Sequence, residues 1–126
     1  MKRLWIGVVL LGILVILGFG TSFGVSQVQR PMEKALQEAG KAALSGRWSE
    51  AEVLGRGAKE QWDTWYPFLA SVTDHNVLEI IEGQLAELDA WYQKQRAAEY
   101  AAACYRIAAL TRELADTHST DWWNLL

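Results

Sequence analysis

Apolar residues dominate the start of the chain. Residues Leu4 to Gly20 are apolar without a break, and residues 23–25 extend the stretch. No charged residue occurs between Arg3 and Arg30. About 20 apolar residues are enough to cross the hydrocarbon of a bilayer as a helix, whereas an amphipathic helix of a soluble protein shows a polar face at every turn. The pattern predicts a transmembrane helix that serves as an uncleaved signal anchor.

The charges beside this run predict its orientation. Lys2 and Arg3 lie on its short side, and basic residues tend to stay in the cytoplasm. We therefore expect a single-pass protein of the cell membrane, with its N-terminus in the cytoplasm and its C-terminal domain extracytoplasmic. A cleaved secretory signal is the alternative, because Gly18-Phe19-Gly20 has the form of a small-x-small cleavage site.

After residue 26 the pattern changes to apolar residues spaced three or four apart, which is typical of amphipathic helices. Strong helix formers prevail, and no alternating run of β-branched residues predicts a strand. The predicted helices run from Gln27 or Pro31 to Leu44, from about Ser49 to Pro67, from about Asp74 to Gln93, and from about Ala97 to Thr117. For the first, direct continuation from the apolar run with a kink at Pro31 is the alternative. No Gly or Pro separates the last two, so one long bent helix is the alternative.

These amphipathic segments must hide their apolar stripes from water, and a compact bundle does so. We therefore expect an all-α fold, in which an N-terminal transmembrane helix is followed by a small antiparallel bundle of three to four helices. The predicted domains are residues 1–25, the cytoplasmic tip and transmembrane anchor, and residues 26–126, the extracytoplasmic helical bundle.

Local signals mark the second predicted helix of this bundle. Ser49 followed by Glu52 fits a capping box, which would begin the helix. Gly55 and Gly57 weaken the helix but would let another helix approach closely. Pro67 is expected to end or bend it.

Aromatic residues gather where an up-and-down path would return to the membrane. That path brings the corner between the second and third helices, and the C-terminus, back to the bilayer surface. Rings with polar edges favour this interface. The candidate membrane-interface aromatics are Trp62, Trp65, Tyr66, Phe68, Trp122 and Trp123. The alternative is that these rings only pack the end of the bundle.

Charge narrows the range of partners. The segment after residue 26 holds all 15 acidic residues and ten of the 12 basic ones, which gives a formal charge of −5. This acidity argues against nucleic acid and against an electrostatic grip on anionic lipid. The expected partners are the lipid bilayer itself, an unknown membrane or envelope protein, and a second copy of the chain. A homo-oligomer is suggested by Gly20-x-x-x-Gly24, a spacing found in packed membrane helices.

One cluster of polar residues raises the question of chemistry. Asp74 and His75 are followed by Glu79 and Glu82, which would share one side of a helix with His75. This set could hold a metal or form a hydrolytic site centred on His75 with Asp74 and Glu79. The competing interpretation is that Asp74 caps the helix, its carboxylate accepting free backbone N–H groups. We favour the cap, because no second histidine is near in the sequence.

No other feature predicts catalysis or a cofactor. Cys104 is the single cysteine, so no disulfide can form within the chain, and a small buried apolar residue is its expected role. The sequence contains neither a nucleophile-elbow motif nor a phosphate-binding glycine loop. We therefore expect a non-enzymatic protein that binds no metal and no cofactor.

The chain resembles a family of small bacterial membrane proteins of unknown function. The features that carry the resemblance are Lys2-Arg3, the apolar run Leu4 to Val25, Trp62 with Trp65, Asp74-His75, and the end Asn124-Leu125-Leu126. The resemblance implies a bacterial membrane setting and supplies no activity. Together with the bundle it suggests an interaction or structural module at the outer face of the membrane.

Overall fold

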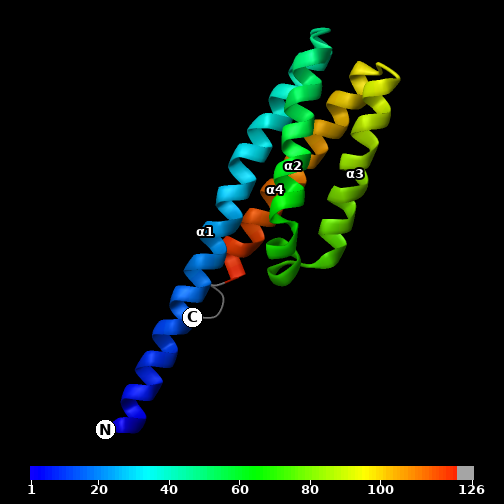
Figure 1. Cartoon of the computed structure of the whole chain (residues 1–126). Helices are drawn as coiled ribbons and strands as arrows, with labels where there is room; N and C mark the ends of the chain where they lie inside the picture. Colours follow the sequence, from blue (N-terminus) through cyan, green and yellow to red (C-terminus); the bar gives the residue numbers. More distant parts are fainter. Residues whose placement is uncertain (122–126) are drawn as a thin grey trace.

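The computed structural model describes the backbone of residues 1–121, and the side chains of these except residues 18, 21–23, 25–26, 28 and 117–121. Within this part the chain is all-α. It forms α1 (Lys2–Leu44), α2 (Trp48–Val72), α3 (His75–Gln93) and α4 (Ala97–Asp121), as Figure 1 shows. The predicted helices after residue 26 therefore exist, and the third and fourth are separate.

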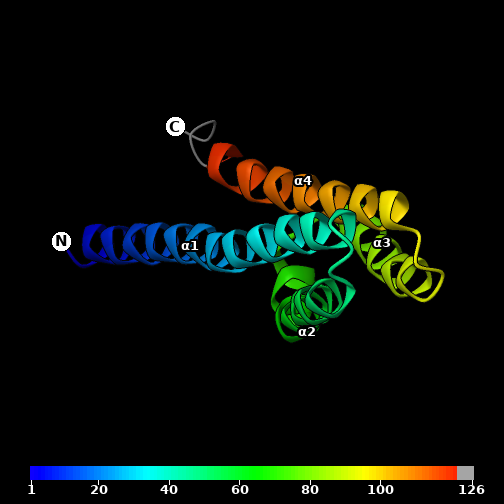
Figure 2. The same cartoon turned by 90° about the horizontal axis from the view of Figure 1, so that it is seen from above.

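The first helix is longer than the bundle. α1 has 43 residues and continues through Pro31 without a break. Its C-terminal half lies among the other helices, while its N-terminal half extends beyond them (Figures 1 and 2). α1 crosses the domain boundary placed at residues 25 and 26, so that boundary stays a prediction.

The predicted transmembrane helix is wrong. In the part of the chain that the structure describes, no helix is long and apolar enough to cross a membrane. The unbroken run of described apolar side chains in α1 extends from Leu4 to Leu17. At 1.5 Å per residue this run rises only about 21 Å, which is short of the roughly 30 Å of bilayer hydrocarbon. The signal-anchor role that depended on this helix loses its support.

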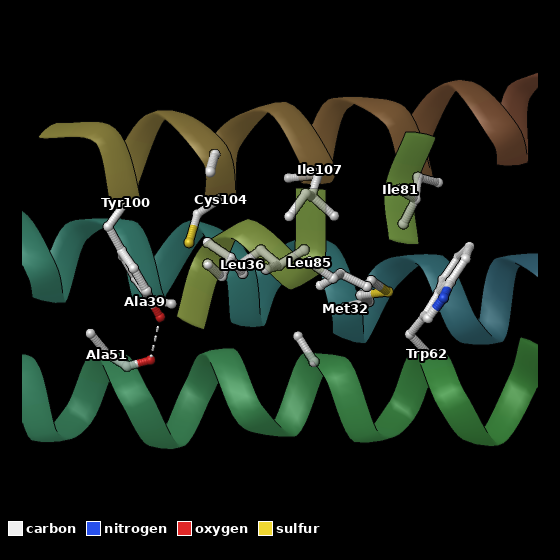
Figure 3. Close-up of a cluster of buried hydrophobic side chains, with 14 of the residues drawn as sticks. Met32, Leu36, Ala39, Ala51, Trp62, Ile81, Leu85, Tyr100, Cys104 and Ile107 are labelled. Carbon is white, nitrogen blue, oxygen red and sulfur yellow. Dashed lines mark hydrogen bonds between the residues drawn. The ribbon is translucent and has the colours of Figure 1, made fainter. Parts of the chain in front are cut away.

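The core follows the predicted helical stripes closely. α1 buries Met32 and Leu36, and α4 buries Cys104 and Ile107, all of them with no exposed surface (Figure 3). The other fully or almost fully buried large side chains are Trp62, Leu69, Leu78, Ile81, Leu85, Leu88, Tyr100 and Leu114. Burial of each such side chain contributes about 1.5–3 kcal/mol, so this shared core is the main source of stability.

α1 and α4 form the closest pair of helices. Gly40 of α1 makes this approach feasible, because a Cβ atom there would lie 3.1 Å from the ring of Tyr105. At the other end of the contact, Arg112 donates to the carboxylate of Glu33. α2 packs on α1 and α3 packs on α4, and the contact between α2 and α3 is the sparsest of the four contacts between neighbouring helices. Figure 2 shows the arrangement of the four helices from above. The bundle is therefore open on its α2–α3 side.

Two tight turns connect the antiparallel helices. After α1, Gly46 adopts φ +76°, and the N–H of Arg47 donates to the carbonyl of Ala42 at 2.8 Å. After α3, Gln95 adopts φ 50°, and Arg96 N–H donates to the Trp91 carbonyl at 3.0 Å. Both arrangements satisfy the last carbonyls of a helix. The second turn does so without a glycine, which is why the sequence left it open.

The capping box and the proline expected to begin and end α2 both lie inside the helix. The helix already begins at Trp48, so Ser49 lies inside it, and no side chain caps its start by a hydrogen bond. Instead Arg47 and Glu50 form an ion pair at 2.8 Å across the first turn. Pro67 also lies inside the helix, which ends at Val72.

Candidate functional site

The cleft between α2 and α3 is the candidate functional site. It is about 640 Å³ in volume, which is within the range of natural ligand and peptide pockets. Its lining residues come from three helices: Glu52, Gly55, Arg56, Lys59, Trp62 and Asp63 from α2, Glu82, Leu85, Ala86, Leu88, Asp89 and Tyr92 from α3, and Tyr100 from α4. The floor is apolar and aromatic, and the two rims are charged.

Tyr100 fixes the floor of this cleft. Its ring is buried, and its hydroxyl donates to the backbone carbonyl of Ala51 at 2.9 Å, a bond that ties α4 to α2 (Figure 3). Gly55 leaves the space for that hydroxyl, because an added Cβ atom would lie less than 3.0 Å from it. Burial raises the pKa of the Tyr100 phenol, so the hydroxyl remains a hydrogen-bond donor across the physiological range.

Aromatic contacts continue from the floor toward both ends of α2. Trp48 packs edge-on against Tyr92 and Tyr100, with ring centroids 5.9 and 5.6 Å apart. Trp62 is buried and lies 6.0 Å from the ring of Tyr66. The indole N–H of Trp62 has no hydrogen-bond partner. Edge-on ring pairs add stability beyond the area they bury, so these contacts hold the floor rigid.

The rims of the cleft carry more negative than positive charge. Arg56 pairs with Glu52, whose hydrogen bond and charge raise the pKa of the Arg56 guanidinium. Asp89 accepts a hydrogen bond from Gln93 at 3.3 Å. Four carboxylates line the cleft, those of Glu52, Asp63, Glu82 and Asp89, against the two cations Arg56 and Lys59, which leaves a net charge of −2. The cleft therefore favours a cationic ligand.

The predicted pair Asp74 and His75 lies away from this cleft, at the start of α3. Both residues are exposed, and the Asp74 carboxylate accepts the backbone N–H of Asn76 at 3.0 Å as the N-cap of the helix. Among the described residues no three His, Cys, Asp or Glu side chains come together in a way that could hold a metal ion. Glu82 lines the cleft, whereas Asp74, His75 and Glu79 do not. The structure gives the metal-site alternative no support.

Cys104 has the environment of a packing residue. It is buried against the core, and burial raises the pKa of its thiol to about 12. The reactive form of cysteine is the thiolate, which is scarce at neutral pH with such a pKa. The side chain is therefore unsuited to act as a nucleophile.

The predicted interface aromatics differ in their exposure. Trp62 is buried and Tyr66 is half-buried, while Trp65 is 36% exposed and packs edge-on against Phe68. Phe68 in turn lies against Gly24 of α1, where a Cβ atom would be 3.0 Å from the ring. This contact holds the part of α2 near the α2–α3 corner beside α1, at the end of the apolar run. Their role at a membrane interface stays a prediction, and Trp122 and Trp123 lie outside the described residues.

The N-terminal half of α1 carries the most extensive apolar surface that the structure describes. The side chains of Leu4, Trp5 and Ile16 are 75, 73 and 71% exposed. Ten further large apolar side chains between residues 6 and 19 are also exposed: Ile6, Val8, Val9, Leu10, Leu11, Ile13, Leu14, Val15, Leu17 and Phe19. Water-soluble proteins rarely expose a continuous apolar surface of this kind, so it marks an interaction site.

Sequence reasoning missed the cleft for a simple reason. Its lining residues follow the ordinary helical spacing of polar and apolar positions. No local sequence pattern indicates that α2 and α3 diverge. The one usable signal was Gly55, which suggested close approach of another element. Tyr100 of α4 makes that approach, whereas Gly57 faces open space.

Comparison with known proteins gives the family and no activity. The model of a domain of unknown function, DUF4363, matches residues 19–125. Searches of curated proteins and of solved structures gave no match. The matched region includes the whole α2–α3 cleft and excludes most of the apolar run of α1.

Proposed function

We propose that this chain, which belongs to the DUF4363 family, is a membrane-associated helical module that binds other proteins. The observation that carries the membrane part is the exposed apolar surface on the N-terminal half of α1. The cleft between α2 and α3 supports the binding part. The expected absence of enzymatic activity stays a prediction.

Lipid is the occupant that suits the apolar half of α1. Thirteen large apolar side chains are exposed between Leu4 and Phe19. At about 1 kcal/mol or more for each, their transfer out of water is worth on the order of 10 kcal/mol. The backbone is already helical, so its polar groups are satisfied within the helix and do not oppose entry into hydrocarbon.

The charge of the bundle argues against electrostatic attachment to lipid. The segment after residue 26 has a formal charge of −5, which anionic headgroups would repel. Apolar insertion has no such requirement, and it acts equally on zwitterionic lipid. We therefore expect binding to vesicles without net charge. The extracytoplasmic location of the bundle is part of the same proposal, and labelling of an introduced surface cysteine in intact cells tests it.

Flotation with phosphatidylcholine vesicles tests the lipid association. The full chain is expected to float with the vesicles, and a variant with Leu10→Glu and Leu14→Glu is expected to stay behind. Each acid in hydrocarbon costs about 2.5–3.5 kcal/mol, so two of them remove much of the transfer free energy. The matched control is Val53→Glu with Ile80→Glu, because these side chains of the bundle are also exposed, at 64 and 52%.

Three results would contradict the lipid association. The first is a wild-type chain that stays at the bottom of the gradient. The second is a Leu10/Leu14 variant that floats as well as the Val53/Ile80 control. The third is a wild-type chain that forms oligomers without lipid and then ignores vesicles, which would assign the apolar surface to a second copy.

A further inference from the structure

The contact between α2 and α3 is the sparsest of the four contacts between neighbouring helices of the bundle. α2 packs mainly on α1, and α3 packs mainly on α4. We propose that this open side binds an amphipathic, basic helix of a partner protein. The inference rests on the protein-binding role proposed above, names the class of partner, and is independent of lipid association.

The dimensions of the cleft suit a helix. Its lining extends from Glu52 to Asp63 along α2 and from Glu82 to Tyr92 along α3. At 1.5 Å per residue these stretches are each about 15 Å long, or about three helical turns. A helix laid in such a groove contacts it through residues at i, i+3 or i+4, and i+7, which span about 10 Å and so fit within this length.

The floor offers contacts at the matching spacing. On α3, Leu85, Leu88 and Tyr92 recur at intervals of three and four residues and line the cleft; the two leucines are almost fully buried beneath it, and the half-buried Tyr92 exposes more of its side chain. On α2, Gly55 presents no side chain, which keeps that wall low near Tyr100. The apolar face of a partner helix would lie over this floor, and its polar face would remain in water.

The rim specifies the charge of the partner. Once the Arg56–Glu52 ion pair is set aside, the remaining lining charges are one cation, Lys59, and three carboxylates, those of Asp63, Glu82 and Asp89. Asp63 and Glu82 lie at the end of the lining that is nearer the α2–α3 corner, and Asp89 lies toward its other end. Lysines or arginines at both ends of a partner helix would therefore find carboxylates, whereas an acidic helix would be repelled.

A fluorescent reporter in the cleft can test this with the full chain in nonionic detergent. Ala86 lines the cleft and is exposed, so Ala86→Cys can carry an environment-sensitive dye, while Cys104 is buried and protected from labelling. The probe is a 15-residue amphipathic peptide of leucine and lysine, compared with the same peptide carrying glutamate in place of lysine. We expect a saturable signal with the lysine peptide. The affinity of the glutamate peptide should be lower by roughly tenfold or more.

Charge reversal at the rim separates binding in the cleft from binding to detergent. Replacement of Asp63, Glu82 and Asp89 by lysine is expected to lower the affinity for the lysine peptide roughly tenfold or more. The matched control makes the same charge change at exposed acids of the same helices outside the cleft: Glu60→Lys, Glu79→Lys and Glu87→Lys. The control is expected to change the affinity less than about twofold, because these acids lie away from the lining.

Clear results would overturn the inference. Specific binding in the cleft is excluded if the two triple variants lose the same affinity for the lysine peptide, or if the rim variant loses none. It is also excluded if a dye at Ala90, which is exposed and outside the lining, gives the same signal as the dye at Ala86. If lysine at the rim disturbs the helical circular dichroism, Asp63→Asn with Glu82→Gln and Asp89→Asn replaces it, with a smaller loss of affinity expected. Vesicle flotation of the same variants should be unchanged, so failure of peptide binding and failure of lipid binding are distinguishable.

Discussion

Two glycines of α2 respond in opposite ways to the same substitution. Gly57 faces open space, so Gly57→Ala is expected to stabilise the helix by about 1 kcal/mol through its higher helix propensity. Gly55 gains the same amount from propensity, but its new Cβ atom would lie less than 3.0 Å from the Tyr100 hydroxyl. That hydroxyl is held by its 2.9 Å hydrogen bond to the Ala51 carbonyl, so it cannot move aside without losing the bond.

The balance at Gly55 can be worked from these contacts. Displacing the Tyr100 ring breaks the bond to Ala51 and leaves a buried hydroxyl without a partner, at a cost of about 1–3 kcal/mol. The propensity gain of about 1 kcal/mol offsets part of this. We expect Gly55→Ala to lower the free energy of unfolding by about 1 kcal/mol net, or the midpoint of thermal unfolding by about 4–8 °C for a domain of this size.

A Tyr100→Phe background separates the steric clash from the helix propensity of residue 55. In Tyr100→Phe the hydroxyl is gone, and the nearest ring atom to the new Cβ of residue 55 is Cζ at 3.7 Å, an ordinary contact. In that background Gly55→Ala should stabilise the protein by about 1 kcal/mol, as Gly57→Ala does. Thermal unfolding followed by far-UV circular dichroism, with all variants in one detergent, measures each step. A clash with the Tyr100 hydroxyl is refuted if Gly55→Ala stabilises the wild type as much as Gly57→Ala does, or if Gly55→Ala still destabilises the protein in the Tyr100→Phe background.

Two further predictions concern the cap of α3 and the response to alkali. Asp74→Ala should lower the free energy of unfolding by about 1 kcal/mol, because the N–H of Asn76 loses its acceptor, and Asp74→Asn should lower it less. The same unfolding assay measures both variants. If His75→Ala destabilised the protein more than Asp74→Ala, the capping role of Asp74 would be contradicted. The thiol of Cys104 titrates at about pH 8.5 in the unfolded chain and at about pH 12 in the folded protein. Between these values the unfolded chain binds fewer protons, so the free energy of unfolding should fall as the pH rises. Cys104→Ala should flatten this decline in unfolding midpoint against pH, and an unchanged slope would show that the thiol does not contribute.

The buried stripes were the most predictable part of the fold. Leu78, Ile81 and Leu85 are buried in α3, as their spacing indicates. Such spacing is reliable because a helix that must bury one face has few ways to arrange it. The turn at Gln95 was not predictable, because a non-glycine residue there adopts a positive φ that the backbone bonds around it sustain.

The ends of helices and the N-terminal span were less accessible to sequence reasoning. Pro31 suited either the first turn of a helix or a kink in a continuous one, and α1 continues through it. The burial of Met32 and Leu36 just beyond Pro31 helps to hold the helix together. The apolar composition of residues 4–25 suggested a transmembrane helix, which the described part of α1 does not provide. Asp74 was correctly placed at a helix start, but the cleft depends on how two distant helices diverge, and no local pattern records that.

The continuity of α1 has a mechanical consequence. One uninterrupted helix of 43 residues joins the apolar half to the half that packs against α2 and α4, so there is no loop between them at which the bundle could swivel. Because the helix is continuous over about 65 Å, a tilt of its first half also tilts the bundle. The direction in which the α2–α3 side opens is thereby set by whatever holds the far tip of this rod.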